Sequence, residues 1–121
     1  MFSIEIEDAK ALFKITWSGQ VHPDETRRCV EEVGAAIADF RPGFRALVDM
    51  TNLESMDLAC APHLGSLMDL CAAKQVEHVI RVIPDPRKDI GLNIMSSFRY
   101  GSKVRVTVCE TLGEAIRQLA E

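Results

Sequence analysis

The sequence predicts an α/β domain built on a single mixed sheet, with the element order β-β-α-β-α-β-α-β-α. Two alternating apolar segments stand close together at the N-terminus, which is typical of an antiparallel hairpin. After them, apolar runs of strand length alternate with stretches of helical periodicity, the pattern of parallel strands joined by right-handed crossovers. The 121 residues are enough for one such domain, so residues 1–121 are expected to form a single unit.

The first part of the chain begins with the predicted hairpin. Apolar and polar residues alternate in residues 2–7 and again in residues 11–17, and the second strand is expected to end at residues 18–20. Pro23, with acidic residues directly after it, suits the first turn of a helix. The apolar side of that helix is a single stripe, made of Val30, Val33, Ile37 and Phe40.

The middle of the chain predicts a buried strand, a loop and a helix. Residues 44–50 are mostly apolar and form the strand, whereas residues 51–57 form a polar loop with two apolar anchors. Pro62 places the start of the following helix near residues 58–60, because proline is tolerated in the first helical turn. This helix turns four residues toward one side: Leu64, Leu67, Met68 and Cys71.

The C-terminal part repeats strand and helix twice. Residues 79–83 are predicted to be a buried strand and residues 104–108 an alternating one. Between them a helix runs from Arg87 to Phe98, and its inward residues are Ile90, Ile94, Met95 and Phe98. The last helix begins at Thr111 with the S/T-x-x-E pattern of a capping box. Its apolar side consists of Leu112, Ala115, Ile116 and Leu119.

Composition and charge exclude several classes of function. Lys and Arg number 14 against 18 Asp and Glu, so the formal charge is −4 and general binding to nucleic acid or anionic lipid is not expected. No apolar run reaches the roughly 18–20 residues of a membrane helix, and the start of the chain does not resemble a secretory signal. The four cysteines form neither a CxxC pair nor a zinc pattern. We therefore expect a cytoplasmic protein with buried free thiols, no metal and no cofactor.

One segment gives a more specific indication. Residues 47–60 read Leu-Val-Asp-Met-Thr-Asn-Leu-Glu-Ser-Met-Asp-Leu-Ala-Cys, with Asp49 at a strand end and Asp57 before a helix. This segment and the element order of the whole chain resemble STAS domains, the fold of bacterial anti-sigma factor antagonists. In that family the central strand ends in Asp-Leu-Ser-Gly and the next helix starts at Ile-Asp-Ser-Ser-Gly, with the same spacing of the two aspartates. The closing residues 111–121 also resemble the last helix of the family.

The same segment departs from the family at the phosphorylation site. In the antagonists, the second serine of Asp-Ser-Ser-Gly accepts phosphate from a partner kinase. Here Leu58, Ala59 and Cys60 replace Ser-Ser-Gly, and Ala59 has no hydroxyl, so this serine switch is excluded. The resemblance therefore implies a divergent member with a non-enzymatic binding or regulatory role, and does not imply control of a sigma factor. The expected partner is either another protein, such as a kinase-like or membrane-associated regulator, or a second copy of the chain. Thr51 and Ser55 are the hydroxyls that remain in the loop for modification.

Cys60 and His63 raise the alternative of nucleophilic catalysis. A thiol in the first turn of a helix has its pKa lowered by the positive helix end, and His63 follows three residues later on nearly the same face. A Cys/His pair is a known nucleophile arrangement. No third orienting residue or oxyanion site is evident, so a structural cysteine beside a surface histidine is the favoured interpretation.

Asp49 at a strand end also suggests the phosphoacceptor of a response-regulator-like fold. That fold requires an acidic pair after the first strand, a hydroxyl after the fourth and a lysine after the fifth. Pro84 and Cys109-Glu110 occupy the last two places, so we reject this reading. Asp49 and Asp57 are instead expected to accept backbone amide hydrogen bonds and brace the loop between them.

Arg87 and Lys88 form a local cationic turn after a strand. Ligands of open α/β sheets bind beyond the carboxyl ends of strands, where amides at helix starts hold anions. An anion contact at Arg87 and Lys88 is one interpretation. The other is a solvated turn in which both cations pair with Asp85 and Asp89.

The third helix carries more apolar residues than one inward stripe needs, namely Leu92, Met95, Phe98 and Tyr100 in addition to its isoleucines. A large buried side is one explanation. We favour a contact surface for a partner or a second copy of the chain.

The leading hypothesis is a STAS-like interaction module without catalysis. Its contact surface combines the third helix with a loop and helix start formed by Asp49, Thr51, Asn52, Ser55, Met56, Asp57, Leu58, Ala59 and Cys60. The alternative is a protein that binds a small anionic or lipid-like molecule in the crevice at the strand ends. An enzyme that depends on Cys60 ranks third.

Overall fold

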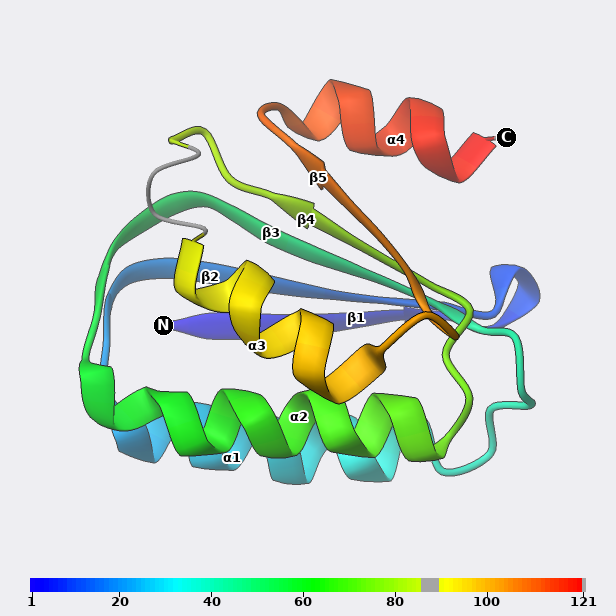
Figure 1. The fold of residues 1–121 in the computed structure, drawn as a ribbon, viewed down its shortest axis with the longest axis horizontal. Coiled ribbons are helices and arrows are strands. Elements are labelled where there is room, and N and C mark those ends of the chain that lie inside the picture. The colour runs from blue at the N-terminus through cyan, green and yellow to red at the C-terminus, as the bar shows by residue number, and fades with distance from the viewer. Residues whose placement is uncertain (86–89, 121) are drawn as a thin grey trace.

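The computed structural model describes residues 1–85 and 90–120, without the side chains of Ile90, Asn93 and Phe98. In this part of the chain five strands form one sheet in the order β1-β2-β3-β4-β5 (Figure 1). Their bounds are β1 Phe2–Glu7, β2 Leu12–Val21, β3 Arg45–Met56, β4 His78–Val82 and β5 Arg105–Cys109. The first pair is antiparallel and the other three pairs are parallel, which confirms the predicted mixed sheet with its N-terminal hairpin.

Four α-helices cover the two faces of the sheet within the described residues. α1 (Pro23–Ala36), α2 (Ala61–Ala73) and α3 (Ile90–Tyr100) lie on one face, and α4 (Leu112–Ala120) lies alone on the other (Figure 1). Short 3-10 turns, η1 (Asp8–Lys10) and η2 (Leu58–Cys60), precede β2 and α2. The predicted order of strands and helices is therefore confirmed.

The sheet separates two apolar cores. The larger core lies under α1, α2 and α3 and contains the three largest fully buried side chains, Trp17, Phe13 and Phe44. The smaller core, under α4, consists of Leu12, Leu47, Ile80, Val82, Cys109 and Ala115. All four cysteines are buried and free, as their apolar neighbours in the sequence predict.

The segment predicted as a loop, Thr51–Asp57, is instead mostly strand, and that prediction was wrong. β3 continues to Met56 because β2 also runs on past residues 18–20 to Val21 and pairs with it, Val21 opposite Met56. The register of this pair shifts twice, between Thr16 and Ser18 and between Gly19 and Gln20. Bulges of this kind break the two-residue alternation of side chains, which is why the sequence shows no strand pattern here.

Two predicted inward residues are exposed. Ile94 of α3 is 57% exposed and Ile116 of α4 is 55% exposed, so both assignments were wrong. Among the described side chains of α3, Ser96 and Tyr100 are buried, and the predicted inward Met95 is partly buried against the larger core. Ser96 Oγ accepts a 2.7 Å hydrogen bond from the buried Arg81 of β4. The predicted inward residues Ile90 and Phe98 have side chains outside the described part of the structure. In α4 the fully buried position is Ala115, and the predicted cap is present as the bond from Glu114 N–H to Thr111 Oγ1.

Candidate functional site

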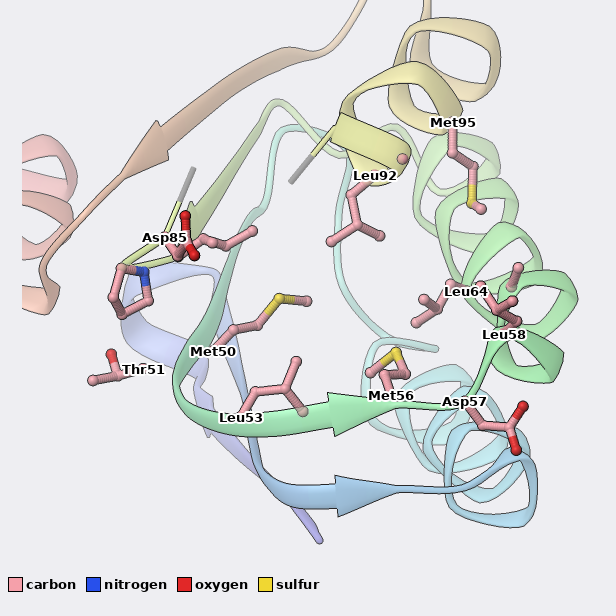
Figure 2. A pocket seen from close by; sticks show the side chains of 14 residues that line it. Met50, Thr51, Leu53, Met56, Asp57, Leu58, Leu64, Asp85, Leu92 and Met95 are labelled. Atoms are coloured by element: carbon pink, nitrogen blue, oxygen red, sulfur yellow. The ribbon is translucent and has the colours of Figure 1, made fainter. Parts of the chain in front are cut away.

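An apolar pocket of about 330 Å³ opens at the carboxyl ends of β3 and β4. Its apolar side chains converge from three directions, with β3 on one side, α2 opposite it and α3 above (Figure 2). They are Met50, Leu53, Met56, Leu58, Leu64, Ile83, Leu92 and Met95. Three of these are methionines, whose flexible thioether side chains adapt to ligands of different shape.

The pocket exists because β3 is longer than β4. The pairing of these two strands ends at Asp49 opposite Val82, whereas β3 and β2 continue together as far as Met56. Ile83, Pro84 and Asp85, which follow β4, line the pocket together with the extension of β3. The pocket therefore lies in the space that β4 would fill if it ran on beside β3.

The two aspartates brace the ends of the β3 extension, as predicted. Asp49 Oδ1 accepts hydrogen bonds from the backbone N–H of Thr51 at 3.0 Å and from its hydroxyl at 2.5 Å. Asp57 is the N-cap of η2, and its Oδ1 accepts a hydrogen bond from Ala59 N–H at 2.9 Å. Both carboxylates thus fix the backbone that carries the pocket-lining side chains.

Leu58 is the most unusual side chain at the pocket. It lies directly after the Asp57 cap, lines the pocket and is 92% exposed. Exposed leucines are common singly, but this one adjoins an open apolar pocket, and such continuous apolar surface marks interaction sites.

The structure brings together some of the predicted site residues and separates others. Thr51, Met56, Asp57 and Leu58 line the pocket. Asn52, Ser55 and Ala59 are exposed beside them without lining it. Asp49 and Cys60 are buried outside the lining. Arg87 and Lys88, the predicted anion contact, lie outside the described residues.

Sequence reasoning missed part of the pocket wall, because Met50, Leu64 and Ile83 resemble ordinary core residues. Leu92 and Met95, which belong to the apolar surplus noted in the third helix, do line the pocket. The signal in the sequence was the pair of apolar residues within the polar segment, Leu53 and Met56, which line the pocket rather than anchor a loop.

Cys60 does not have the environment of a nucleophile. The thiol is fully buried, and desolvation raises its pKa, with Asp57 adding to the rise and a hydrogen bond with Thr26 opposing it. Its Sγ lies 3.8 Å from the carbonyl oxygen of Val21 as a weak donor, while His63 is half-buried on α2. The expected lowering of the thiol pKa by the helix end was wrong, because burial outweighs the helix dipole here.

Neither a metal site nor a membrane helix emerges from residues 1–85 and 90–120. No three His, Cys, Asp or Glu side chains come together there as metal ligands. Over the same ranges, no helix combines the length and the apolar character needed to cross a bilayer.

Comparison with known proteins gives matches in structure but not in sequence. No protein-family model matches the chain, and no curated protein matches it significantly. An uncharacterised DUF3478-family protein from Shewanella loihica PV-4, described as having a SpoIIAA-like fold, superposes with a TM-score of 0.74 at 18% identity, covering 98% of this chain and 93% of the other.

Two anti-sigma factor antagonists are similar at 16% identity. One is from Mycobacterium paratuberculosis, with a TM-score of 0.63 over 100% of this chain and 96% of the other. The second is SpoIIAA in its unphosphorylated form, with a TM-score of 0.67 over 99% of this chain and 98% of the other. The protein is therefore a mixed α/β domain with the fold of the anti-sigma factor antagonists. In particular, it has the SpoIIAA-like, or STAS-like, fold over nearly its whole length.

Proposed function

We propose that the protein is a non-enzymatic regulatory module that binds a protein partner through the pocket mouth, defined here as Met56, Asp57, Leu58 and the exposed side of α3. The observation that carries this proposal is Leu58, a 92% exposed apolar side chain beside an open apolar pocket. The structural likeness to proteins named as antagonists of another protein supports it.

Binding in this proposal is regulated without a serine phosphorylation at the helix start. Ala59, at the position of the family's phosphoacceptor, offers no hydroxyl. Thr51 and Ser55 are both exposed, but the Thr51 hydroxyl is already hydrogen-bonded to Asp49 at 2.5 Å. A phosphorylation assay with wild-type protein and Ser55→Ala tests whether the Ser55 hydroxyl is used. We further propose that residues 1–121 act as one cytoplasmic domain, which the four buried free thiols support.

The matched pair Leu58→Asp and Ile116→Asp tests the interaction. Both replace an exposed apolar side chain by a carboxylate, but Ile116 lies on α4, on the opposite face of the sheet. Affinity capture with quantitative mass spectrometry is expected to find a partner that wild type and Ile116→Asp retain and Leu58→Asp loses. A partner profile that is identical for all three proteins contradicts the proposed surface.

A second candidate function, binding of a small apolar molecule, is favoured by the pocket itself. Its volume lies at the lower end of the range of small-molecule sites, about 300–1,000 Å³. The charged residues of its described lining are the carboxylates of Asp57 and Asp85, so a lipid-like ligand suits it better than an anionic one. Native mass spectrometry of the purified protein is expected to show the additional mass of a bound molecule. The control variant Leu53→Asp, which places a carboxylate in the pocket lining, is expected to lose this additional mass.

A further inference from the structure

In residues 1–85 and 90–120, the β3 extension has an edge without a strand partner, beside the pocket. Over residues 50–56, β2 is its only strand neighbour in the described part of the chain, because β4 pairs no further than Asp49. The Thr51 N–H is bound to Asp49, so the edge that remains runs from Asn52 to Met56. This is close to the usual strand length of about 5–6 residues. Open edges of this length are templates for an added strand unless something covers them.

Apolar side chains surround the space beside this edge. Leu53 and Met56 of β3 point toward Leu92 and Met95 of α3 across the pocket, as Figure 2 shows. An extended peptide has side chains that alternate between two sides, so a strand laid along β3 would turn every second side chain toward these residues. Backbone hydrogen bonds then supply affinity and the pocket supplies specificity, as in other strand-addition sites.

Charge at the edge indicates which peptide fits. Glu54 and Asp57 are both exposed on or next to the extension, and Asp57 lines the pocket. A second copy of the chain, docked by two-fold symmetry at this place, would set the same carboxylates against each other. A segment that carries Lys or Arg would meet complementary charge, so the charges favour a basic partner over self-association.

We propose that the site binds an extended, basic segment of the partner protein, which adds to the sheet beside Asn52–Met56 and inserts alternate apolar side chains into the pocket. This inference rests on the proposed function, since it names the partner's chemistry at the same surface. It goes further in requiring backbone pairing, which side-chain docking of a folded partner does not.

Random linear peptides displayed on phage and selected on the full chain provide the probe. The selected peptides are expected to alternate apolar residues and to carry Lys or Arg. Backbone NMR is expected to show shifts at Asn52–Met56 and in α3. The best peptide is then synthesised in three further forms: N-methylated at its odd residues, N-methylated at its even residues, and with Lys or Arg replaced by Glu.

Only one edge of an added strand pairs with β3. One N-methylated form is therefore expected to lose affinity by at least about tenfold, because it lacks the N–H groups that pair with β3, while the other stays within about twofold. The peptide with Glu in place of Lys or Arg is expected to bind the wild-type protein more weakly. The original peptide is expected to bind Leu58→Asp more weakly and Ile116→Asp with unchanged affinity. Failure to enrich peptides, equal effects of the two methylation patterns, or NMR shifts centred on α4 would overturn the proposal.

The outcomes separate this inference from the proposed function. If a captured partner depends on Leu58 while selected peptides tolerate both methylation patterns, the partner docks through side chains and only the strand-addition inference fails. If sedimentation shows that the purified chain is a dimer and that Leu58→Asp dissociates it, a second copy of the chain occupies the site. That result would overturn the proposal of a basic segment.

Discussion

Arg105 of β5 donates a hydrogen bond from Nη2 to Nδ1 of His78 on β4 at 2.9 Å, and this bond fixes the protonation of a buried imidazole. Arginine only donates, so Nδ1 must accept and the ring proton lies on Nε2, which is 2.7 Å from Thr107 Oγ1. Burial lowers the pKa of His78, and the charges of Arg105 and Arg45 lower it further, against a smaller opposing effect of Glu77. His78 is therefore neutral in the folded protein at pH 7.

Acid is expected to destabilise the fold through His78. The folded-state pKa lies below the ordinary value near 6.5, so below that pH the unfolded chain takes up a proton that the native state does not. The contribution of His78 to the free energy of unfolding is thus fully present above pH 6.5. It decreases as the pH drops through 6.5, by at most about 1.4 kcal/mol per pH unit for this one group. Urea unfolding between pH 5 and pH 8 measures this slope.

The variant His78→Gln isolates the contribution of His78 to the pH dependence of the free energy of unfolding. It removes the titrating ring and is expected to flatten the slope around pH 6, while costing about 1–2 kcal/mol at pH 8 for the two hydrogen bonds it weakens. His63→Gln, on α2, is the matched histidine-to-glutamine variant for comparison. If His78→Gln retains the full slope, the acid sensitivity originates elsewhere.

Thr51 is expected to stabilise the protein mainly through its hydroxyl. That group donates to the buried carboxylate of Asp49 at 2.5 Å, and hydrogen bonds to a charged group are worth about 1.5–3 kcal/mol. Thr51→Val should lower the free energy of unfolding by about 1–2 kcal/mol, because Thr51 N–H remains as a second donor. Thr51→Ser keeps the hydroxyl and should cost less than half as much. Because valine keeps the methyl group of Thr51 and serine loses it, equal losses in the two variants would contradict the assignment of the effect mainly to the hydroxyl.

The order of strands and helices was predictable because most elements carry a strong local pattern. The alternation in β1 and the stripe Leu64, Leu67, Met68 and Cys71 in α2 each reflect one buried side, and all four of these α2 residues are buried. The β3 extension was not predictable, because its strand character comes from pairing with β2 through two register shifts. Long-range pairing of exposed, polar residues leaves no period in the sequence.

The candidate site was predictable in position but not in composition. The aspartate spacing and the strand-end rule placed it at the junction of β3 and α2, where Asp57 and Leu58 line the pocket. The pocket itself depends on how far β3 extends beyond the end of β4, and no local sequence pattern indicates this length difference. In α3 the apolar pattern did not indicate the buried Ser96, which faces inward because its hydroxyl accepts a hydrogen bond from the buried Arg81 of β4.

Two glycines are expected to respond oppositely to alanine. A Cβ at Gly43 meets nothing within 4 Å, but its φ of +92° is a conformation that L-residues rarely adopt. Gly43→Ala should therefore lower the free energy of unfolding by about 1–2 kcal/mol. Gly34 lies inside α1, where a Cβ makes an ordinary 3.6 Å contact with Leu70. Gly34→Ala should raise the stability by about 0.5–1 kcal/mol. Thermal and urea unfolding of both variants provide the comparison.

The four thiols are expected to react slowly with alkylating or disulfide reagents in the native state. Desolvation raises the pKa of Cys29 and of Cys71 to about 12 and also raises those of Cys60 and Cys109. Reaction requires the thiolate, so at pH 8 an exposed small-molecule thiol should react at least about tenfold faster than any of the four.

Mass spectrometry after brief labelling, with and without urea, measures this difference. Full labelling of four sites is expected only in urea. The decisive site is Cys60, since it is the one cysteine for which a catalytic role was considered. Selective fast labelling of Cys60 in the folded protein, absent in Cys60→Ala and unchanged in Cys29→Ala, would restore the nucleophile hypothesis. Uniformly slow labelling supports a structural role for the thiol, which packs in the larger core.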